Sequence, residues 1–344
     1  MTTLRSQPAP SSDVTDDRTP RRGARLRSRA AKYGIAYVLV AIVVLFSVLR
    51  PATYPTAGNF GSILQANSSI ALLALGFMIP LILGKFDLSV AAMAAMSGLL
   101  AAGMTSRGTI AQWPLAVVVV LAVAAVVGLI NGYLVAYVKL NSLVVTLGTS
   151  SIIGGFVLYY SSGTVIFSGI PQGFLAIGQS KILGVPLPFV IVVVVATILW
   201  FVLYYRPIGR EIYAIGVGED AARLIGIRVD GLTVAAFTLS AVLASMGGCI
   251  QAAQVGSAAP TTGAEYLLPA IAACFLGETS IRRGYYNVWG TVIAVFLVAA
   301  GTSGLYMLGA QAWVQPVFNG VVLVGAVLAA KLGSAGRSTR PRRR

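Results

Sequence analysis

Long apolar runs recur along this chain and are interrupted only by short stretches rich in glycine, proline or charge. Most of them approach the roughly 20 residues that a helix needs to cross the hydrocarbon core of a bilayer. Only 10% of the 344 residues are charged and the mean hydropathy is +0.85, whereas about a quarter of a soluble domain is charged. We therefore expect an all-α, polytopic transmembrane bundle of about ten segments, at residues 33–49, 61–84, 88–104, 113–138, 142–160, 185–204, 231–254, 264–277, 286–308 and 312–330.

The eighth stretch, 264–277, differs from the others in length. A helix of about 14 residues is too short to cross the hydrocarbon core alone. This stretch predicts a short re-entrant or broken helix, whose free backbone groups need protein or water around them.

Positive charge gathers at the two ends of the chain. The formal net charge is +15, and eight of the 25 Lys and Arg residues precede residue 33 while six follow residue 330. Short basic tails beside a hydrophobic body are typical of cytoplasmic segments near anionic lipid, and no aromatic-basic module for nucleic acid accompanies them. We expect a disordered basic cytoplasmic tail at 1–30, one transmembrane domain at 31–332 and a basic cytoplasmic tail at 333–344.

The internal charges predict the orientation. If the N-terminus lies in the cytoplasm, only Arg50, Arg107 and Lys181 of the 25 positive residues fall outside, provided that the short eighth segment returns the chain to the cytoplasmic face. Both termini are then cytoplasmic in a multi-pass protein of the inner or plasma membrane.

Few residues here could carry enzymatic chemistry. The chain has no histidine, and its two cysteines, Cys249 and Cys274, lie inside apolar runs, so we expect no metal site, no disulfide framework and no cofactor. An integral-membrane enzyme is disfavoured because no paired carboxylates or nucleophile-base set is visible. A phosphate-binding loop of the form Gly-x-x-x-x-Gly-Lys-[Ser/Thr] is also missing from the sequence, so ATP hydrolysis is expected on a separate partner.

The longest polar internal stretch is 205–230, which the charge bias places in the cytoplasm. Gly218 gives the chain a flexible entry into a short helix, and Glu219 and Asp220 suit the N-terminus of that helix. Gly226 then ends the helix. It could be a solvated connector, but a connector needs only a few residues, so we favour a docking element that couples the bundle to a partner. The predicted coupling residues are Gly218, Glu219, Asp220, Ala221, Ala222, Arg223 and Gly226.

A weak internal echo links residues 81–93 with 274–286, each an apolar run followed by Leu-Gly, a charge and a serine. Transporters often contain two related halves whose broken segments meet near the substrate path. In the first copy, Asp87 is the only acidic residue between Asp17 and Glu211. We expect it to cap the following helix rather than to contact substrate.

Several polar residues lie in or beside the expected spans. Some could line a hydrophilic path, although the commoner use of such residues is to join helices by hydrogen bonds. The candidates for lining a path are Asn67, Asn131, Asn141, Thr146, Gln251 and Gln254.

Four blocks of residues also follow one another in the order of a known family. They are Gly84 with Asp87, Leu88, Ser89 and Val90; Gly128 to Ala136 with Thr146, Leu147 and Gly148; Pro207 to Ile227; and Leu276, Gly277, Thr279, Ser280, Gly284, Gly290 and Thr291. After its N-terminal tail, nearly the whole chain resembles the ribose-type (simple sugar) permease family of ABC importers. The resemblance implies a permease that pairs with itself, binds two cytoplasmic ATPases through its coupling loops and receives substrate from an extracytoplasmic binding protein.

The chain departs from that family where glycine usually follows Gly84 and Gly277, since Lys85 and Glu278 stand there. Opposite charges at matching positions of the echo suggest a pair on the cytoplasmic side that forms a gate or a structural tie. Alternatively, each side chain could reach water separately. The candidate pathway or gate residues are Lys85, Asp87, Ser89, Glu278, Thr279 and Ser280.

Three functions remain open on the sequence. The leading one is import of a simple sugar, and related permeases would carry nucleosides or branched-chain amino acids instead. An ion-coupled secondary transporter would work without an ATPase, but it should place carboxylates well inside the membrane, whereas Asp87 and Glu265 lie at segment ends.

Overall fold

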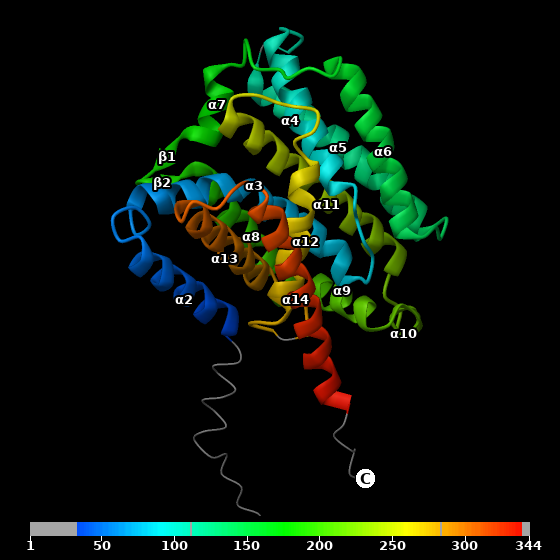
Figure 1. Ribbon diagram of the computed structural model, residues 1–344. Coiled ribbons are helices and arrows are strands. Elements are labelled where there is room, and N and C mark those ends of the chain that lie inside the picture. Colours follow the sequence, from blue (N-terminus) through cyan, green and yellow to red (C-terminus); the bar gives the residue numbers. More distant parts are fainter. Residues whose placement is uncertain (1–32, 111, 283, 339–344) are drawn as a thin grey trace, which may run out of the picture.

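The computed structural model describes residues 33–338 except 111 and 283, with side chains described to residue 328. These residues form thirteen helices and one two-stranded antiparallel hairpin, whose labels follow Figure 1. The helices are α2 (Gly34–Leu49), α3 (Ala57–Ile82), α4 (Val90–Ser106), α5 (Trp113–Ala136), α6 (Ser142–Ser161), α7 (Gln172–Gln179), α8 (Leu187–Tyr205), α9 (Pro207–Val217), α10 (Glu219–Leu224), α11 (Val229–Val255), α12 (Ala264–Glu278), α13 (Val288–Met307) and α14 (Val314–Ser338), and the strands are β1 (Lys181–Ile182) and β2 (Val185–Pro186).

The expected polytopic helical membrane architecture is confirmed. Six helices, α3, α5, α6, α8, α11 and α13, are long and apolar enough to cross a bilayer, and α2, α4 and the first part of α14 are shorter apolar helices. The basic tail at 1–30 lies outside the described residues. At the other end, α14 continues to Ser338, past the expected domain boundary at 332.

The six long helices divide into a central and an outer group. The most apolar windows of α3, α11 and α13 are 72%, 67% and 78% buried, whereas those of α5, α6 and α8 are only 22% to 28% buried. Glycine allows the central helices to touch: a Cβ on Gly76 of α3 would lie 2.8 Å from the Ser240 carbonyl oxygen of α11. Small residues of this kind let membrane helices pack closely, which matters because the hydrophobic effect does not drive helices together inside lipid. The outer helices leave many apolar side chains exposed, such as Val118 of α5, Ile152 of α6 and Ile198 of α8.

Two short helices at one end of the bundle replace the single helix expected between 205 and 230. The expected helix is present as α10, between Gly218 and Gly226, whose φ of 84° ends it. Helix α9 was not predicted, although Pro207 in its first turn and the apolar Ile212 and Ile215 on one face indicate it. In Figure 1, α9 and α10 lie at the same end as the beginning of α2 and the end of α14.

The short eighth segment is α12, which has Pro269 in its interior. Its 15 residues span about 22 Å at 1.5 Å per residue. Before it, residues 257–263 are irregular yet packed among helices: Ala258 pairs with Ile166 in an isolated bridge, and a Cβ on Gly263 would lie 1.9 Å from the Ala91 carbonyl oxygen. The irregular stretch is thus packed against neighbouring helices at Ala258 and Gly263, in keeping with the need of free backbone groups for protein or water around them.

Candidate translocation cavity and coupling network

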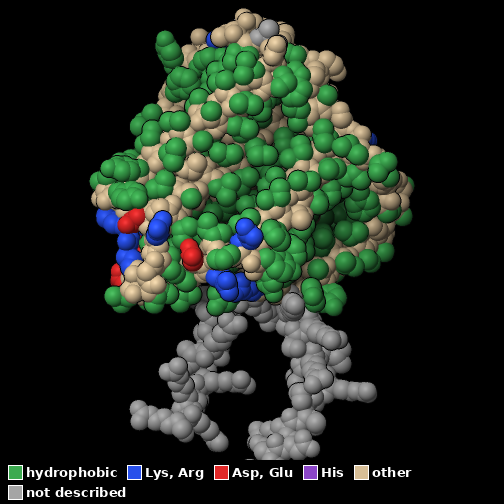
Figure 2. Space-filling model, turned by 180° about the vertical axis from the view of Figure 1, so that it is seen from behind, with side chains coloured by type: hydrophobic (Ala, Val, Ile, Leu, Met, Phe, Trp, Pro, Cys, Tyr) green, Lys and Arg blue, Asp and Glu red, His purple; other side chains and the backbone are tan. Residues whose placement is uncertain are grey.

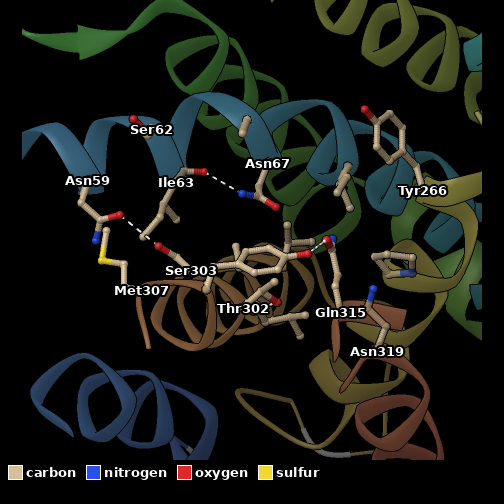
Figure 3. Close-up of a pocket in the computed structure, with 17 residues that line it drawn as sticks. Asn59, Ser62, Ile63, Asn67, Tyr266, Thr302, Ser303, Met307, Gln315 and Asn319 are labelled. Atoms are coloured by element: carbon tan, nitrogen blue, oxygen red, sulfur yellow. Dashed lines mark hydrogen bonds between the residues drawn. The ribbon is translucent and has the colours of Figure 1, made fainter. Parts of the chain in front are cut away.

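A cavity of about 530 Å³ opens between α3, α12, α13 and α14 (Figure 3). Hydroxyl and amide groups alternate with apolar side chains around it, and none of its 17 lining residues is charged. Its size falls within the range of ordinary small-molecule sites. The residues with polar side chains are Asn59, Ser62, Asn67, Tyr266, Thr302, Ser303, Tyr306, Gln315 and Asn319.

Hydrogen bonds across the cavity hold several of these groups in place. Ser303 Oγ donates to Asn59 Oδ1 at 3.0 Å, which joins α13 to α3, and Tyr306 Oη donates to Gln315 Oε1 at 2.6 Å. Asn67 Nδ2 donates to the Ile63 carbonyl oxygen at 2.9 Å. These bonds leave Asn67 Oδ1 as an acceptor and Gln315 Nε2 as a donor for a solute.

Of the predicted path-lining residues, only Asn67 lines this cavity. Gln251 lines a much smaller neighbouring pocket between α4, α11 and α12. Gln254 joins two helices instead, because its Nε2 donates to the Gln65 carbonyl oxygen and its Oε1 accepts from Ser69 Oγ at 3.4 Å. Asn141 caps α6 by accepting the Leu143 N–H at 2.9 Å.

Most of the residues that line the cavity were not predicted, although the sequence contains a pattern that indicates them. Asn59, Ser62 and Asn67 recur at spacings that place them on one face of α3, and Thr302 and Ser303 stand near the end of α13. Polar groups repeated along one face of an otherwise apolar helix indicate a hydrophilic surface inside a membrane bundle.

The segment 84–89, between α3 and α4, holds a buried polar network. Asp87, 1% exposed, accepts the Ser89 N–H at 3.1 Å and the Ser89 hydroxyl at 2.5 Å. The Ser89 hydroxyl accepts from Asn131 Nδ2 at 3.2 Å, and Thr149 Oγ1 donates to Asn131 Oδ1 at 2.6 Å. Asp87 thus holds the turn just before α4 through Ser89. It does not cap the helix as predicted, because Ser89 is the N-cap residue of α4 and no side chain makes a cap hydrogen bond there. Asn131 joins α5 to this segment and to α6.

One face of α6 contacts the backbone of the same segment. Ser142 Oγ accepts the Phe86 N–H at 3.2 Å, and Ser150 Oγ donates to the Leu88 carbonyl oxygen at 3.4 Å. Thr146 lies one turn after Ser142, with its hydroxyl 3.5 Å from the Phe86 carbonyl oxygen. Thr146 and Asn131 therefore lie in a closed contact between helices and not along the cavity.

Beside this segment, five charged residues form a continuous chain of ion pairs. Lys85 Nζ contacts Glu219 Oε2 at 2.9 Å, and Glu219 Oε1 contacts Arg223 Nη2 at 3.0 Å. Arg223 donates two hydrogen bonds to the Asp230 carboxylate, at 2.5 and 2.9 Å, and Asp230 accepts from Lys139 at 2.6 Å. The hydrogen bond from Lys85 lowers the pKa of Glu219 below its ordinary value. Figure 2 shows Lys, Arg, Asp and Glu gathered at this end of a largely hydrophobic face.

The hypothesised pair between Lys85 and Glu278 is wrong in this structure. Lys85 meets Glu219 because α9 packs on the end of α3 and brings the first residue of α10 beside Lys85, an approach that the similarity of the two motifs does not predict. Glu278 lies against the Tyr286 side chain.

The second of the two similar segments, residues 274–286, is held by its own hydrogen bonds. Asn287 Nδ2 donates to the Gly277 and Ser280 carbonyl oxygens at 3.0 and 3.1 Å, and its Oδ1 caps α13 at Gly290. Thr279 Oγ1 donates to the Leu276 carbonyl oxygen of its own helix. Thr279 and Ser280 therefore lie in a tight turn, away from the cavity lining.

Helix α9 contacts this second copy. Tyr213 Oη donates to the Tyr286 carbonyl oxygen at 2.6 Å, and the Arg282 guanidinium lies 4.7 Å from the ring centre of Tyr213 and 4.6 Å from that of Tyr285. The pair α9 and α10 therefore touches both echoed segments, one through aromatic rings and the other through the Lys85 ion pair.

Comparison with known proteins now identifies the chain. Residues 59–327 match the family described as the permease component of branched-chain amino acid transport systems. The chain belongs to this permease family. It is 33% identical to the ribose import permease protein RbsC of Haemophilus influenzae, over 85% of this chain and 90% of that protein. RbsC of Bacillus subtilis is 35% identical, over 88% of this chain and 94% of its own length.

Other permeases in the comparison carry different names. The D-allose transport system permease protein AlsC of Escherichia coli is 31% identical, over 86% of this chain and 90% of its own length. The galactose/methyl galactoside import permease protein MglC of the same species is 29% identical, over 86% of this chain and 93% of its own length. No solved structure matches the chain.

Proposed function

We propose that this permease is the transmembrane subunit of an ABC importer for a simple sugar, and that the 530 Å³ cavity is part of its translocation pathway. The family description names branched-chain amino acids, whereas the relatives compared are ribose, allose and galactose permeases. The cargo therefore has to be argued from the site.

The uncharged lining of the cavity is the observation that carries the proposal. An amino acid keeps an ammonium and a carboxylate, and removing these charges from water is costly without charged partners. A sugar offers neutral hydroxyl groups, each of which donates and accepts, and the amides of Asn67, Gln315 and Asn319 match them. Both donors and acceptors are thus available for a neutral polyhydroxylated solute.

The proposed topology has about ten membrane segments with both termini in the cytoplasm. It is supported by the positive-charge bias of the sequence and by the common end of α2, α9, α10 and α14 in Figure 1. Helix α12 then serves as a short broken segment that begins inside the bundle. The cavity lies toward the opposite, extracytoplasmic half, since its lining includes residues near the start of α3 and the end of α13.

The proposed partners follow from the same arrangement. Two cytoplasmic ATPases would dock on α10 at residues 218–226, where Leu224 is 88% exposed and Ile225 is 74% exposed despite being apolar. An extracytoplasmic binding protein would deliver the sugar, and a second copy of the chain would complete the pathway. Membrane lipid surrounds the outer helices, and nucleic acid has no role.

An uptake experiment tests this function. Proteoliposomes would hold the permease with a candidate ABC ATPase, and a candidate binding protein would be added with radiolabelled D-ribose, D-allose, D-galactose, leucine or uridine. We expect ATP-dependent import of at least one sugar and none of leucine. Import of leucine or uridine alone would favour the related cargo classes, and import driven by an ion gradient without the ATPase would favour a secondary transporter.

A further inference from the structure

Lys85 is the point where the charged end of the molecule touches the segment 84–89. Its ammonium lies 2.9 Å from Glu219, and the two side chains are only 20% and 35% exposed. The backbone holds Lys85 firmly, because its N–H donates to the Pro80 carbonyl oxygen while Gly84, at a φ of 75°, closes the end of α3. Lys85 is therefore positioned by α3 to reach the first residue of α10.

The far side of the same segment is fixed inside the bundle. Two residues after Lys85, Asp87 enters the buried network that reaches α5 through Asn131. The backbone between them is held by α6 at Ser142. A displacement of α10 that acts on Lys85 would thus reach two membrane helices through a short, closely packed path.

The remaining ion pairs keep α10 in place without Lys85. Arg223 binds both Glu219 and Asp230, and these contacts join α10 to the start of α11. Helix α9 is held separately, since a Cβ on Gly216 would lie 1.9 Å from the Ile82 carbonyl oxygen. Loss of Lys85 would therefore uncouple α10 from the segment 84–89 and leave the coupling helices folded.

We propose that Lys85 is a positioning residue of the import cycle: its ion pair with Glu219 transmits movement of α10 to the segment 84–89 and, through Asp87, Ser89 and Asn131, to α5 and α6. This inference rests on the proposed function, because the movement is the one that a docked ATPase imposes. Closure of such an ATPase moves membrane helices as packed elements, for which a direct contact is required.

Lys139 offers a matched control at the other end of the charge chain. It is also a lysine paired with a carboxylate, Asp230, but its side chain is 55% exposed and it contacts none of residues 84–89 in the described hydrogen bonds and ion pairs. An ion pair exposed to this degree contributes little. A general effect of removing a positive charge would appear in both lysine variants.

The first test is chemical. A carbodiimide couples an amine to a carboxylate only when the two are in contact, so treatment of the full chain in membranes should join Lys85 to Glu219 in a cross-linked peptide found by mass spectrometry. Lys85→Arg should abolish the cross-link, because a guanidinium does not react in this way. Absence of the cross-link from the unaltered chain would overturn the proposal.

The second test measures transmission and cargo separately in the complex with its ATPase. Trapping the ATPase with vanadate should change the amide hydrogen exchange of residues 84–89 in the unaltered chain. The same change should occur in the Lys85→Arg and Lys139→Met variants, but it should be absent from Lys85→Met. Import per ATP hydrolysed should fall about tenfold in Lys85→Met alone. An exchange response in Lys85→Met equal to that of the unaltered chain would overturn the inference. If exchange behaves as expected but the unaltered complex imports none of the sugars, the proposed cargo fails while the role of Lys85 stands.

Discussion

The cavity between α3, α12, α13 and α14 and the charge chain from Lys85 to Lys139 are both polar, but they are built in opposite ways. The cavity is hollow, about 530 Å³, and its lining is uncharged. At the other end, the five charged residues from Lys85 to Lys139 contact one another directly, and Asp87 beside them is buried in hydrogen bonds. Open neutral groups suit reversible contact with a passing solute, whereas closed ion pairs suit transmission between protein segments. Variants that affect one region and spare the other test this division.

The largest effect is expected from filling the cavity. Ser303→Trp places an indole where Ser303 now meets Asn59, and the cavity is large enough to hold the ring without displacing a helix. We expect sugar import to fall below detection while the protein remains folded, measured by uptake in proteoliposomes and by size-exclusion chromatography. The control is Val321→Trp, at a position that is 66% exposed on α14. Normal import by Ser303→Trp would show that solute does not use this space.

A smaller but substantial effect is expected from Asp87→Ala, which should lower the stability of the folded protein. The change leaves the N–H and hydroxyl of Ser89 without their buried acceptor, and an unsatisfied buried group costs about 1–3 kcal/mol. Thermal unfolding in detergent should show the loss, and Asp87→Asn should lose less because its amide oxygen still accepts. The control, exposed Asp220→Ala, should change stability by less than about 0.5 kcal/mol. Equal stability of Asp87→Ala and Asp220→Ala would contradict a structural role for the buried network.

A moderate effect is expected from removing one amide of the cavity. Asn67→Ala deletes one hydrogen-bond partner of the solute, worth about 1 kcal/mol, and should raise the KM for sugar import about fivefold. Asn141→Ala is a matched control, because Asn141 caps α6 away from the cavity. It should leave KM unchanged and cost about 1 kcal/mol of stability. The reverse pattern would place the pathway beside Asn141 and away from the cavity.

Local patterns in the sequence were sufficient to predict the long apolar helices, but not the short helices α7 and α9. Stretches such as 142–160 and 286–308 agree with α6 and α13 to within two residues at each end, because long apolar runs are a local signal that lipid requires. The short 264–277 segment was recognisable for the same reason. Helix α9 was missed, since its 11 residues mix charged and apolar side chains and resemble a loop in composition.

The contacts of the candidate site depend on distant parts of the chain and could not be predicted in the same way. Lys85 and Glu219 are 134 residues apart, and their meeting depends on how α10 returns to the end of α3. The cavity likewise needs α3, α13 and α14 to converge. Composition showed that Asn67 and Asn131 were polar residues in a membrane, but it could not show that one faces a cavity and the other a buried network.

The smallest effect is expected from lowering the pH. The cavity lining and the Lys85–Glu219 ion pair should both be nearly insensitive to pH above about pH 5. The Lys85 hydrogen bond lowers the pKa of Glu219 from 4.5, so its stabilising contribution is present above the unfolded-state pKa and is lost only as the pH falls through the lower folded-state pKa. The cavity has no carboxylate or lysine to titrate. Hydrogen exchange of residues 219–224, corrected for the intrinsic rate, should therefore show the same protection at about pH 5 and about pH 7. A loss of protection within this interval would mean that Glu219 titrates in its ordinary range or above it, and that its ion pair with Lys85 does not hold α10.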